Sequence, residues 1–151
     1  MDDEVIGAAL IELADLANCV SGDFHCLHLN MRGLEFDSLH CMLKKYYEEA
    51  ADDFDELAEK AMMFGICVPS PNKASERIQY QDCEGCRYDR QSAVTKIDVI
   101  LKALLNNYMQ MFCILNEIKE DVRVYGIANF LQTRIEYWSK ECYYFNKARG
   151  A

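Results

Sequence analysis

Apolar residues that recur every three to four positions constrain the fold of this chain more than any other feature of its sequence. One stripe of them covers residues 6–31 and a second covers residues 36–64. Two more follow at residues 94–118 and 124–145. This spacing places apolar side chains on one face of an α-helix, and no alternating strand pattern competes with it. The sequence predicts four long helices of about 25 to 30 residues, each about 40 Å long.

Helix-ending residues mark the joins between these stripes. Four glycines fall at or near the joins: Gly33, Gly65, Gly85 and Gly126. Pro69 and Pro71 follow the second stripe and cannot continue a helix. We expect the segment from Ala74 to Gln81 to form a short extra helix inside the long connection between helices two and three. The predicted fold class is all-α, a four-helix bundle whose long connection crosses from end to end, as a single domain over residues 1–151.

Charge and segment composition narrow the possible partners. The formal net charge is −9, and no Lys/Arg-rich tail is present at either end. Such a field repels phosphate backbones and attracts cations, so metal ions are better candidates than nucleic acid, although an acidic surface can also serve solubility alone. No run of about 20 uninterrupted apolar residues occurs, and Met1–Glu4 lacks a basic export signal. We therefore expect a cytoplasmic protein without a membrane segment.

The chain contains eight cysteines. In a reducing compartment we expect them to remain thiols. Cys83 and Cys86 have the spacing of a metal-binding pair, but a zinc ribbon needs a second pair, which this sequence does not offer. Zinc at these two cysteines is therefore not favoured.

The three histidines gather around the first predicted turn. In an antiparallel hairpin that pivots near Leu34, His28 and His40 are each six residues from the pivot and should face one another. Two imidazoles that meet beside a core are suitable ligands for iron or zinc. The alternative is a pair of partly exposed histidines that cap or solvate the turn.

A pair of carboxylates lies further along the second predicted helix. Asp55 and Glu59 are four residues apart and therefore project from one helix face. Such a pair can chelate one cation or bridge two. The alternative is that both belong to a solvated acidic face, since the neighbouring residues are acidic as well.

The length of a helix decides how these groups can combine. His40 and Asp55 are fifteen residues apart, which corresponds to about 22 Å of helix rise. No single ion can touch both within one chain. If the four groups form one site, the carboxylates must come from a second copy packed about a two-fold axis.

The same residues resemble a known family. The block Leu27–Gly33, then Phe36, Leu39–His40 and Asp55–Lys60, with matching spacing through Gly65, is similar to the signature of the Dps family, the mini-ferritins. The resemblance implies a ferritin-like subunit that assembles into a hollow cage of twelve. It also implies oxidation of Fe(II), often by hydrogen peroxide, with ferric iron stored inside and protection against peroxide stress.

The resemblance also assigns the metal ligands. His28 and His40 would come from one subunit and Asp55 and Glu59 from its two-fold mate, with no catalytic residue beyond these ligands. The bound metal would be iron, with zinc able to substitute at the same site. Strong DNA binding is not expected, because DNA-binding family members often use basic tails that this chain lacks.

Two positions depart from the family pattern. Lys44 stands where the family usually has a further carboxylate, and Leu29 stands where a tryptophan is common. A cation at position 44 would weaken metal binding or pair with a ligand carboxylate. Tyr46 and Tyr47, close by on the same helix, could transfer electrons or simply pack.

Three functions therefore stay open. The first is an iron-oxidising mini-ferritin. The second is a non-catalytic helical cage or scaffold in which Lys44 has replaced the metal. The third, weaker alternative is a thiol-based sensor that uses Cys83 and Cys86.

Overall fold

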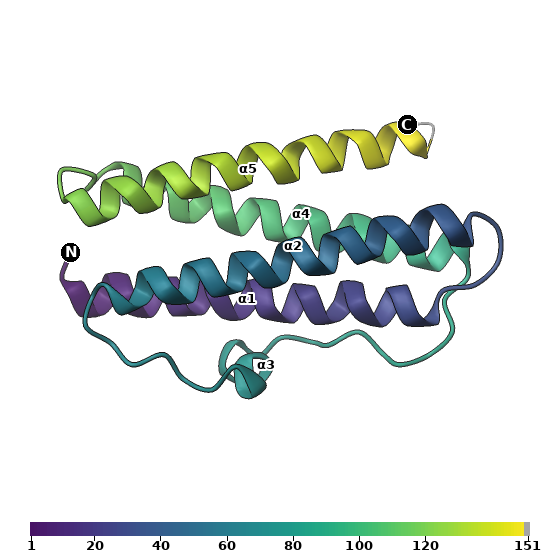
Figure 1. The fold of residues 1–151 in the computed structure, drawn as a ribbon, viewed down its shortest axis with the longest axis horizontal. Helices are drawn as coiled ribbons and strands as arrows, with labels where there is room; N and C mark the ends of the chain where they lie inside the picture. Colours follow the sequence, from purple (N-terminus) through teal and green to yellow (C-terminus); the bar gives the residue numbers. More distant parts are fainter. Residues whose placement is uncertain (150–151) are drawn as a thin grey trace. The chain divides into compact units, whose positions relative to one another are not determined.

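The computed structural model describes residues 1–149, and these residues form four long helices, one short helix and no strand. The long helices are α1 (Asp3–Asn30), α2 (Phe36–Met62), α4 (Arg90–Asn116) and α5 (Val122–Ala148). The short α3 (Ala74–Ile78) follows a 3₁₀ turn at Pro71–Lys73, inside the connection between α2 and α4 (Figure 1). The predicted helices, including the extra one near residue 74, are confirmed.

The chain divides into two compact units, residues 1–97 and the residues from 98 onward, with the boundary inside α4. In the first unit, α1 and α2 lie side by side as an antiparallel hairpin (Figure 1). Every residue of the first apolar stripe is buried: Ile6, Leu10, Leu13, Ala17, Val20, Phe24, Leu27 and Met31. That residues 1–151 fold as one domain stays a prediction.

Local chemistry at the helix ends explains where the first unit turns. The Asp2 carboxylate caps α1 by accepting a hydrogen bond from the Val5 amide at 2.9 Å. After α1 and α2, Gly33 and Gly65 have φ angles of +92° and +78°, a left-handed backbone that glycine adopts without cost.

Gly126 instead lies within α5. It lies near the predicted join but not at it, because α5 begins at Val122 and is capped by Asp121.

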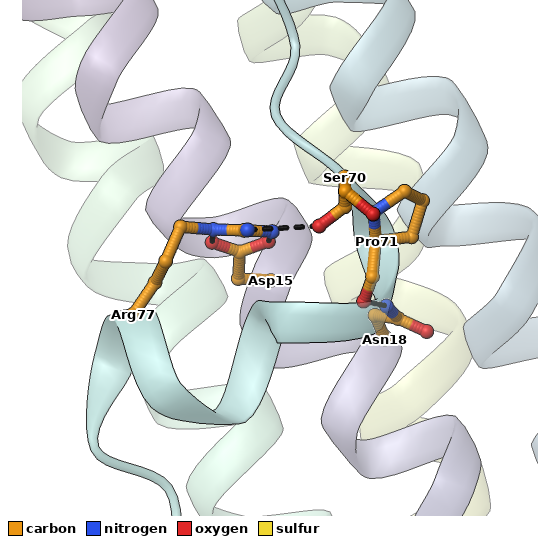
Figure 2. A network of polar contacts seen from close by, with 5 residues as sticks. All are labelled: Asp15, Asn18, Ser70, Pro71 and Arg77. Atoms are coloured by element: carbon orange, nitrogen blue, oxygen red, sulfur yellow. Dashed lines mark hydrogen bonds and ion pairs between the residues drawn. The ribbon is translucent and has the colours of Figure 1, made fainter.

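Buried carboxylates on α1 hold the long connection in place. Asp15 is 2% exposed, and it accepts hydrogen bonds from Nε and Nη2 of Arg77 at 2.8 and 2.7 Å. Arg77 also donates to the Ser70 carbonyl at 2.8 Å, and Asn18 of α1 donates to the Pro71 carbonyl at 2.9 Å (Figure 2). These bonds explain why a segment with little helix of its own runs alongside α1.

Helix α1 is also the one described helix long and apolar enough to span a membrane by length and composition alone, with a mean hydropathy of 1.5 over eighteen residues. Half of that stretch is buried inside the protein. Core helices of soluble proteins reach the same hydropathy, and packing against α2 and α3 gives α1 the buried apolar face of a core helix.

In the second unit, the remainder of α4 and helix α5 run antiparallel. Arg149, at the end of α5, pairs with Asp98 of α4 at 3.4 Å. The Asp121 carboxylate caps the start of α5 by accepting from the Arg123 amide at 2.9 Å. Both helices bury a large aromatic side chain, Tyr108 and Trp138. This unit is therefore a helical hairpin in which the start of α5 is capped.

Candidate metal site

His28 of α1 and His40 of α2 lie at the same level on the two antiparallel helices. Their rings stack with centroids 3.6 Å apart and planes inclined by 14°. The predicted meeting of these two histidines is confirmed. It follows from the short turn at residues 31–35, which places residues equally far from the pivot opposite one another.

Each imidazole is fixed by the backbone of the other helix. Nδ1 of His28 lies 2.8 Å from the carbonyl oxygen of His40, and Nδ1 of His40 lies 2.9 Å from the carbonyl oxygen of His28. A carbonyl oxygen can only accept, so each Nδ1 must carry the proton. In a neutral ring, Nε2 is then the nitrogen with the lone pair. This is the arrangement in which histidine binds metals, because the second hydrogen bond sets the tautomer and the ring orientation.

Burial favours the neutral ring of His28. The side chain is 8% exposed, and burial lowers its pKa below the usual value near 6.5. The nearby charges of His40, His25 and Lys44 act in the same direction, while the hydrogen bond to His40 acts against them. Neutral imidazole is the form that a metal ion requires. The same environment places Lys44 close enough to affect His28 electrostatically.

Aromatic rings surround the histidine pair. Phe36 stacks on His40 with centroids 4.8 Å apart, and His25 stacks on Tyr47 at 4.0 Å. The Tyr47 ring also meets the edge of His28 at 5.3 Å. Tyr46 instead is 1% exposed and packs against Phe24, so Tyr47 is the tyrosine placed beside the candidate ligands.

The His25–Tyr47 stack was not foreseen from the sequence. A usable signal was present, since His25 lies one helical turn before His28 and Tyr47 lies two turns after His40. Residues at these spacings share a helix face. A search along the faces that carry His28 and His40 would therefore have found both.

The carboxylates lie elsewhere on α2. Asp55 and Glu59 are both exposed, and α2 runs without interruption from Phe36 to Met62. The rise of that helix keeps Asp55 about 22 Å from His40 along its axis. Within residues 1–149 no group of three or more histidine, cysteine, aspartate or glutamate side chains is placed to hold a metal ion. One chain thus brings the two histidines together but not the four predicted ligands.

Solved structures show which fold this helix order and connection belong to. Dps from Staphylococcus aureus matches with a TM-score of 0.82 and 18% identity over 97% of this chain and 96% of that one. A C-terminal deletion mutant of Mycobacterium smegmatis Dps matches with a TM-score of 0.82 and 16% identity, covering 95% and 96%. The chain has the Dps fold. No protein-family model and no curated protein sequence matches it.

A third solved structure with this fold is described as ferritin-like. Dps from Vibrio cholerae O1, described as a member of a broad superfamily of ferritin-like diiron-carboxylate proteins, matches with a TM-score of 0.79. Its sequence is 18% identical, and the match covers 96% of this chain and 89% of that one. The predicted fold class, all-α and ferritin-like with a long crossover connection that carries a short extra helix, is confirmed. These likenesses establish the Dps fold, and the metal ligands stay a prediction.

The tautomer of the histidine pair can be measured directly. Long-range ¹H–¹⁵N NMR of the metal-free protein at neutral pH is expected to show His28 and His40 with protonated Nδ1 and unprotonated Nε2, because each Nδ1 donates to a carbonyl. His25→Gln removes the third histidine and assigns the remaining signals. Protonated Nε2 on either ring would contradict the geometry described above.

Proposed function

We propose that this protein is a mini-ferritin of the Dps type that binds and oxidises Fe(II). The observation that supports the proposal most directly is the histidine pair, in which both Nδ1 atoms bond to backbone carbonyls. Paired imidazoles that leave Nε2 for a ligand suit a borderline metal such as Fe(II), and zinc could occupy the same place. The Dps fold and the acidic net charge agree with a protein that handles cations.

The remaining ligands are proposed to come from a second copy. Asp55 and Glu59 are exposed on α2 and too far from His40 for a common ion within one chain. A two-fold axis that packs two hairpins against each other brings the histidines of one subunit to the carboxylates of the other. Exposed apolar residues beside the histidines, Leu29, Leu34 and Phe36, would be covered in such a dimer.

Each group has a distinct part in the proposed chemistry. His28 and His40 would hold Fe(II) through neutral Nε2 atoms, and the carboxylates of the second copy would offset its charge. Two Fe(II) ions would give up one electron each. One hydrogen peroxide molecule would accept both electrons with two protons to form two water molecules, or one dioxygen molecule would accept them with two protons to form hydrogen peroxide. Hydrolysis of the ferric product releases protons, and acidic residues lining a cage interior would retain the ferric product. Tyr47, stacked beside His28, is the aromatic residue best placed to pass an electron.

Assembly and location complete the proposal. The resemblance to Dps implies a homo-oligomer, a cage of twelve subunits built from such dimers, in the cytoplasm. The cage would protect against peroxide by consuming peroxide and free iron together. We propose no strong binding of duplex DNA, because the net charge of −9 repels phosphate.

Removal of both proposed carboxylate ligands should abolish rapid iron oxidation. For Asp55→Ala with Glu59→Ala we expect the initial rate of Fe(II) oxidation to fall by more than about tenfold, since a metal loses affinity when ligands are removed. The helices should persist, because both residues are exposed. Absorbance of the ferric product after addition of Fe(II) to the purified oligomer measures the rate, and circular dichroism checks the fold.

A matched control exists on the same helix. Asp52 and Glu56 have the same spacing of four, are also exposed and neighbour the proposed ligands. Asp52→Ala with Glu56→Ala removes an equal charge and should leave the rate within about twofold of the wild type. Equal losses of the oxidation rate in the two double variants would mean that the general acidity of the helix, and not a specific site, supports oxidation. An unchanged rate in the Asp55/Glu59 double variant would show that these two residues take no part in the mechanism.

One observation favours a second function, a non-catalytic helical cage or scaffold. Lys44 lies four residues after His40 on α2 and therefore shares its helix face. Burial is the main cause that lowers the pKa of His28, and the charge of Lys44 adds a smaller contribution in the same direction. A cation there opposes a metal ion. It could instead pair with Asp55 or Glu59 of the second copy and support the interface.

Replacement of Lys44 distinguishes the two functions. If the protein is a mini-ferritin, the wild type oxidises Fe(II) rapidly, and Lys44→Asp keeps or increases that rate because the repulsion is gone. If it is a scaffold, the wild type is no faster than the Asp55/Glu59 double variant and only Lys44→Asp gains oxidation. Fe(II) titration of the three proteins under identical conditions makes the comparison, and Lys45→Asp, a neighbouring charge change, is the control.

A further inference from the structure

A group of cysteines lies apart from the histidine pair, where the connection after α3 meets α1. Cys26 belongs to α1, and Cys83 and Cys86 belong to the connection before α4. All of them are free thiols, and Cys26 and Cys83 are half-buried. The Tyr88 hydroxyl lies among them. All four residues belong to the same compact unit.

Short contacts bring these side chains together. The Cys83 sulfur lies 3.0 Å from the Tyr88 hydroxyl. That hydroxyl donates to the Glu84 carbonyl at 2.9 Å, and the Cys26 thiol donates to the same carbonyl at 3.5 Å. The Cys26 and Cys83 sulfurs therefore both contact the pair formed by the Tyr88 hydroxyl and the Glu84 carbonyl, which places these two thiols in one cluster.

The surrounding backbone holds this arrangement in place. Asp23, which is 3% exposed, accepts hydrogen bonds from the Cys83 amide at 2.9 Å and from the Tyr80 hydroxyl at 2.8 Å. The backbone around Tyr88 bonds to that of Asn30 and Arg32 at the end of α1. The segment that carries Cys83 is thus tied to α1 on both sides of the cysteine. Upstream, the Arg77–Asp15 ion pair adds a third tie (Figure 2).

From this geometry we propose that Cys26 and Cys83 form an oxidisable dithiol, a modification site that a hydroperoxide converts into a disulfide joining α1 to the connection before α4. The hydroperoxide first oxidises one sulfur to a sulfenic acid, with cleavage of its O–O bond and release of water or an alcohol. The second thiol attacks that sulfur, the S–S bond forms, and the hydroxyl leaves as water. Two thiol hydrogens and two electrons are transferred in total.

The environment of Cys83 also affects the rate at which the disulfide forms. Burial raises the pKa of the Cys83 thiol to about 11. Only thiolates attack hydroperoxides, so the bond should form slowly compared with dedicated peroxide sensors and should accumulate under sustained oxidant. Once formed, it would close a loop from residue 26 to residue 83 and restrain the connection, and a thiol reductant would reverse it.

Peptide mapping of the oxidised protein tests the proposal without iron. The full-length oligomer is incubated with hydrogen peroxide and a metal chelator, free thiols are blocked, and the protein is digested without reductant. Cleavage at lysine and arginine yields peptides 1–32 and 78–87. A further cut before Asp23 separates Cys26 from Cys19. A cut after Glu84 separates Cys83 from Cys86. We expect a cross-linked species that contains Cys26 and Cys83, lighter by two hydrogens and lost on reduction.

Single cysteine variants serve as controls. Cys86→Ser should leave this cross-link in place, whereas Cys26→Ser and Cys83→Ser should each remove it. The exposed Cys41 reports that the oxidant has reached the protein. A Cys83–Cys86 disulfide as the main product, or oxidation of Cys41 without any Cys26–Cys83 bond, would overturn the proposal. Both results are independent of iron oxidation, so failure here leaves the proposed mini-ferritin function unaffected.

Discussion

The rigidity of α2 is the constraint on which the functional account depends. The helix carries His40 near its start and Asp55 and Glu59 in its second half, without a break between them. A regular helix keeps the two groups about 22 Å apart, whatever the side-chain rotamers. If His28, His40, Asp55 and Glu59 bind one metal ion, as proposed, each chain presents half of the ligand set at two separate places. Only association of two chains would then join the halves, and oligomerisation would be linked to the chemistry.

The hairpin of α1 and α2 supplies the other element of the proposal, a histidine pair whose ring positions are set by the fold itself. Reciprocal hydrogen bonds from Nδ1 to backbone carbonyls fix both rings. Side chains that are held in position lose less entropy on binding, which favours affinity. Lys44 adds a positive charge that acts on His28, as a smaller contribution than burial. In the proposed mini-ferritin, the balance between the preorganised imidazoles and that charge would decide whether iron is oxidised.

Much of the fold could be predicted from the sequence, because helical periodicity reports which face is buried. The first stripe was entirely right. The second is buried from Leu39 to Phe64 apart from the half-buried Phe54, whereas Phe36 at its start is 38% exposed. This residue stacks on His40 and lies next to the face that would meet a second copy. Gly126 shows the limit of reading helix ends from glycine alone, since the cap at Asp121 sets the start of α5.

The site was predictable only where geometry follows from spacing. Equal distance from a turn predicted that His28 meets His40, but not which nitrogen bonds to which carbonyl, since that depends on ring rotation. The grouping of Cys26 and Cys83 around Glu84 and Tyr88 had no signal in the sequence. It depends on the path of the long connection, which buried Asp15 and Asp23 select by binding Arg77 and Tyr80. Pairings between distant polar residues are specified by the folded structure and not by local pattern.

Complementation between two inactive variants tests most directly whether the site is shared. One variant lacks the imidazoles (His28→Ala, His40→Ala) and the other lacks the carboxylates (Asp55→Ala, Glu59→Ala). Each alone should be inactive, but in a mixed dimer the intact histidines of one chain meet the intact carboxylates of the other. Random pairing on co-expression would restore about a quarter of the wild-type sites. Fe(II) oxidation near a quarter of the wild-type rate is the expected result, and a co-expressed protein no faster than either variant alone would contradict a site built from two subunits.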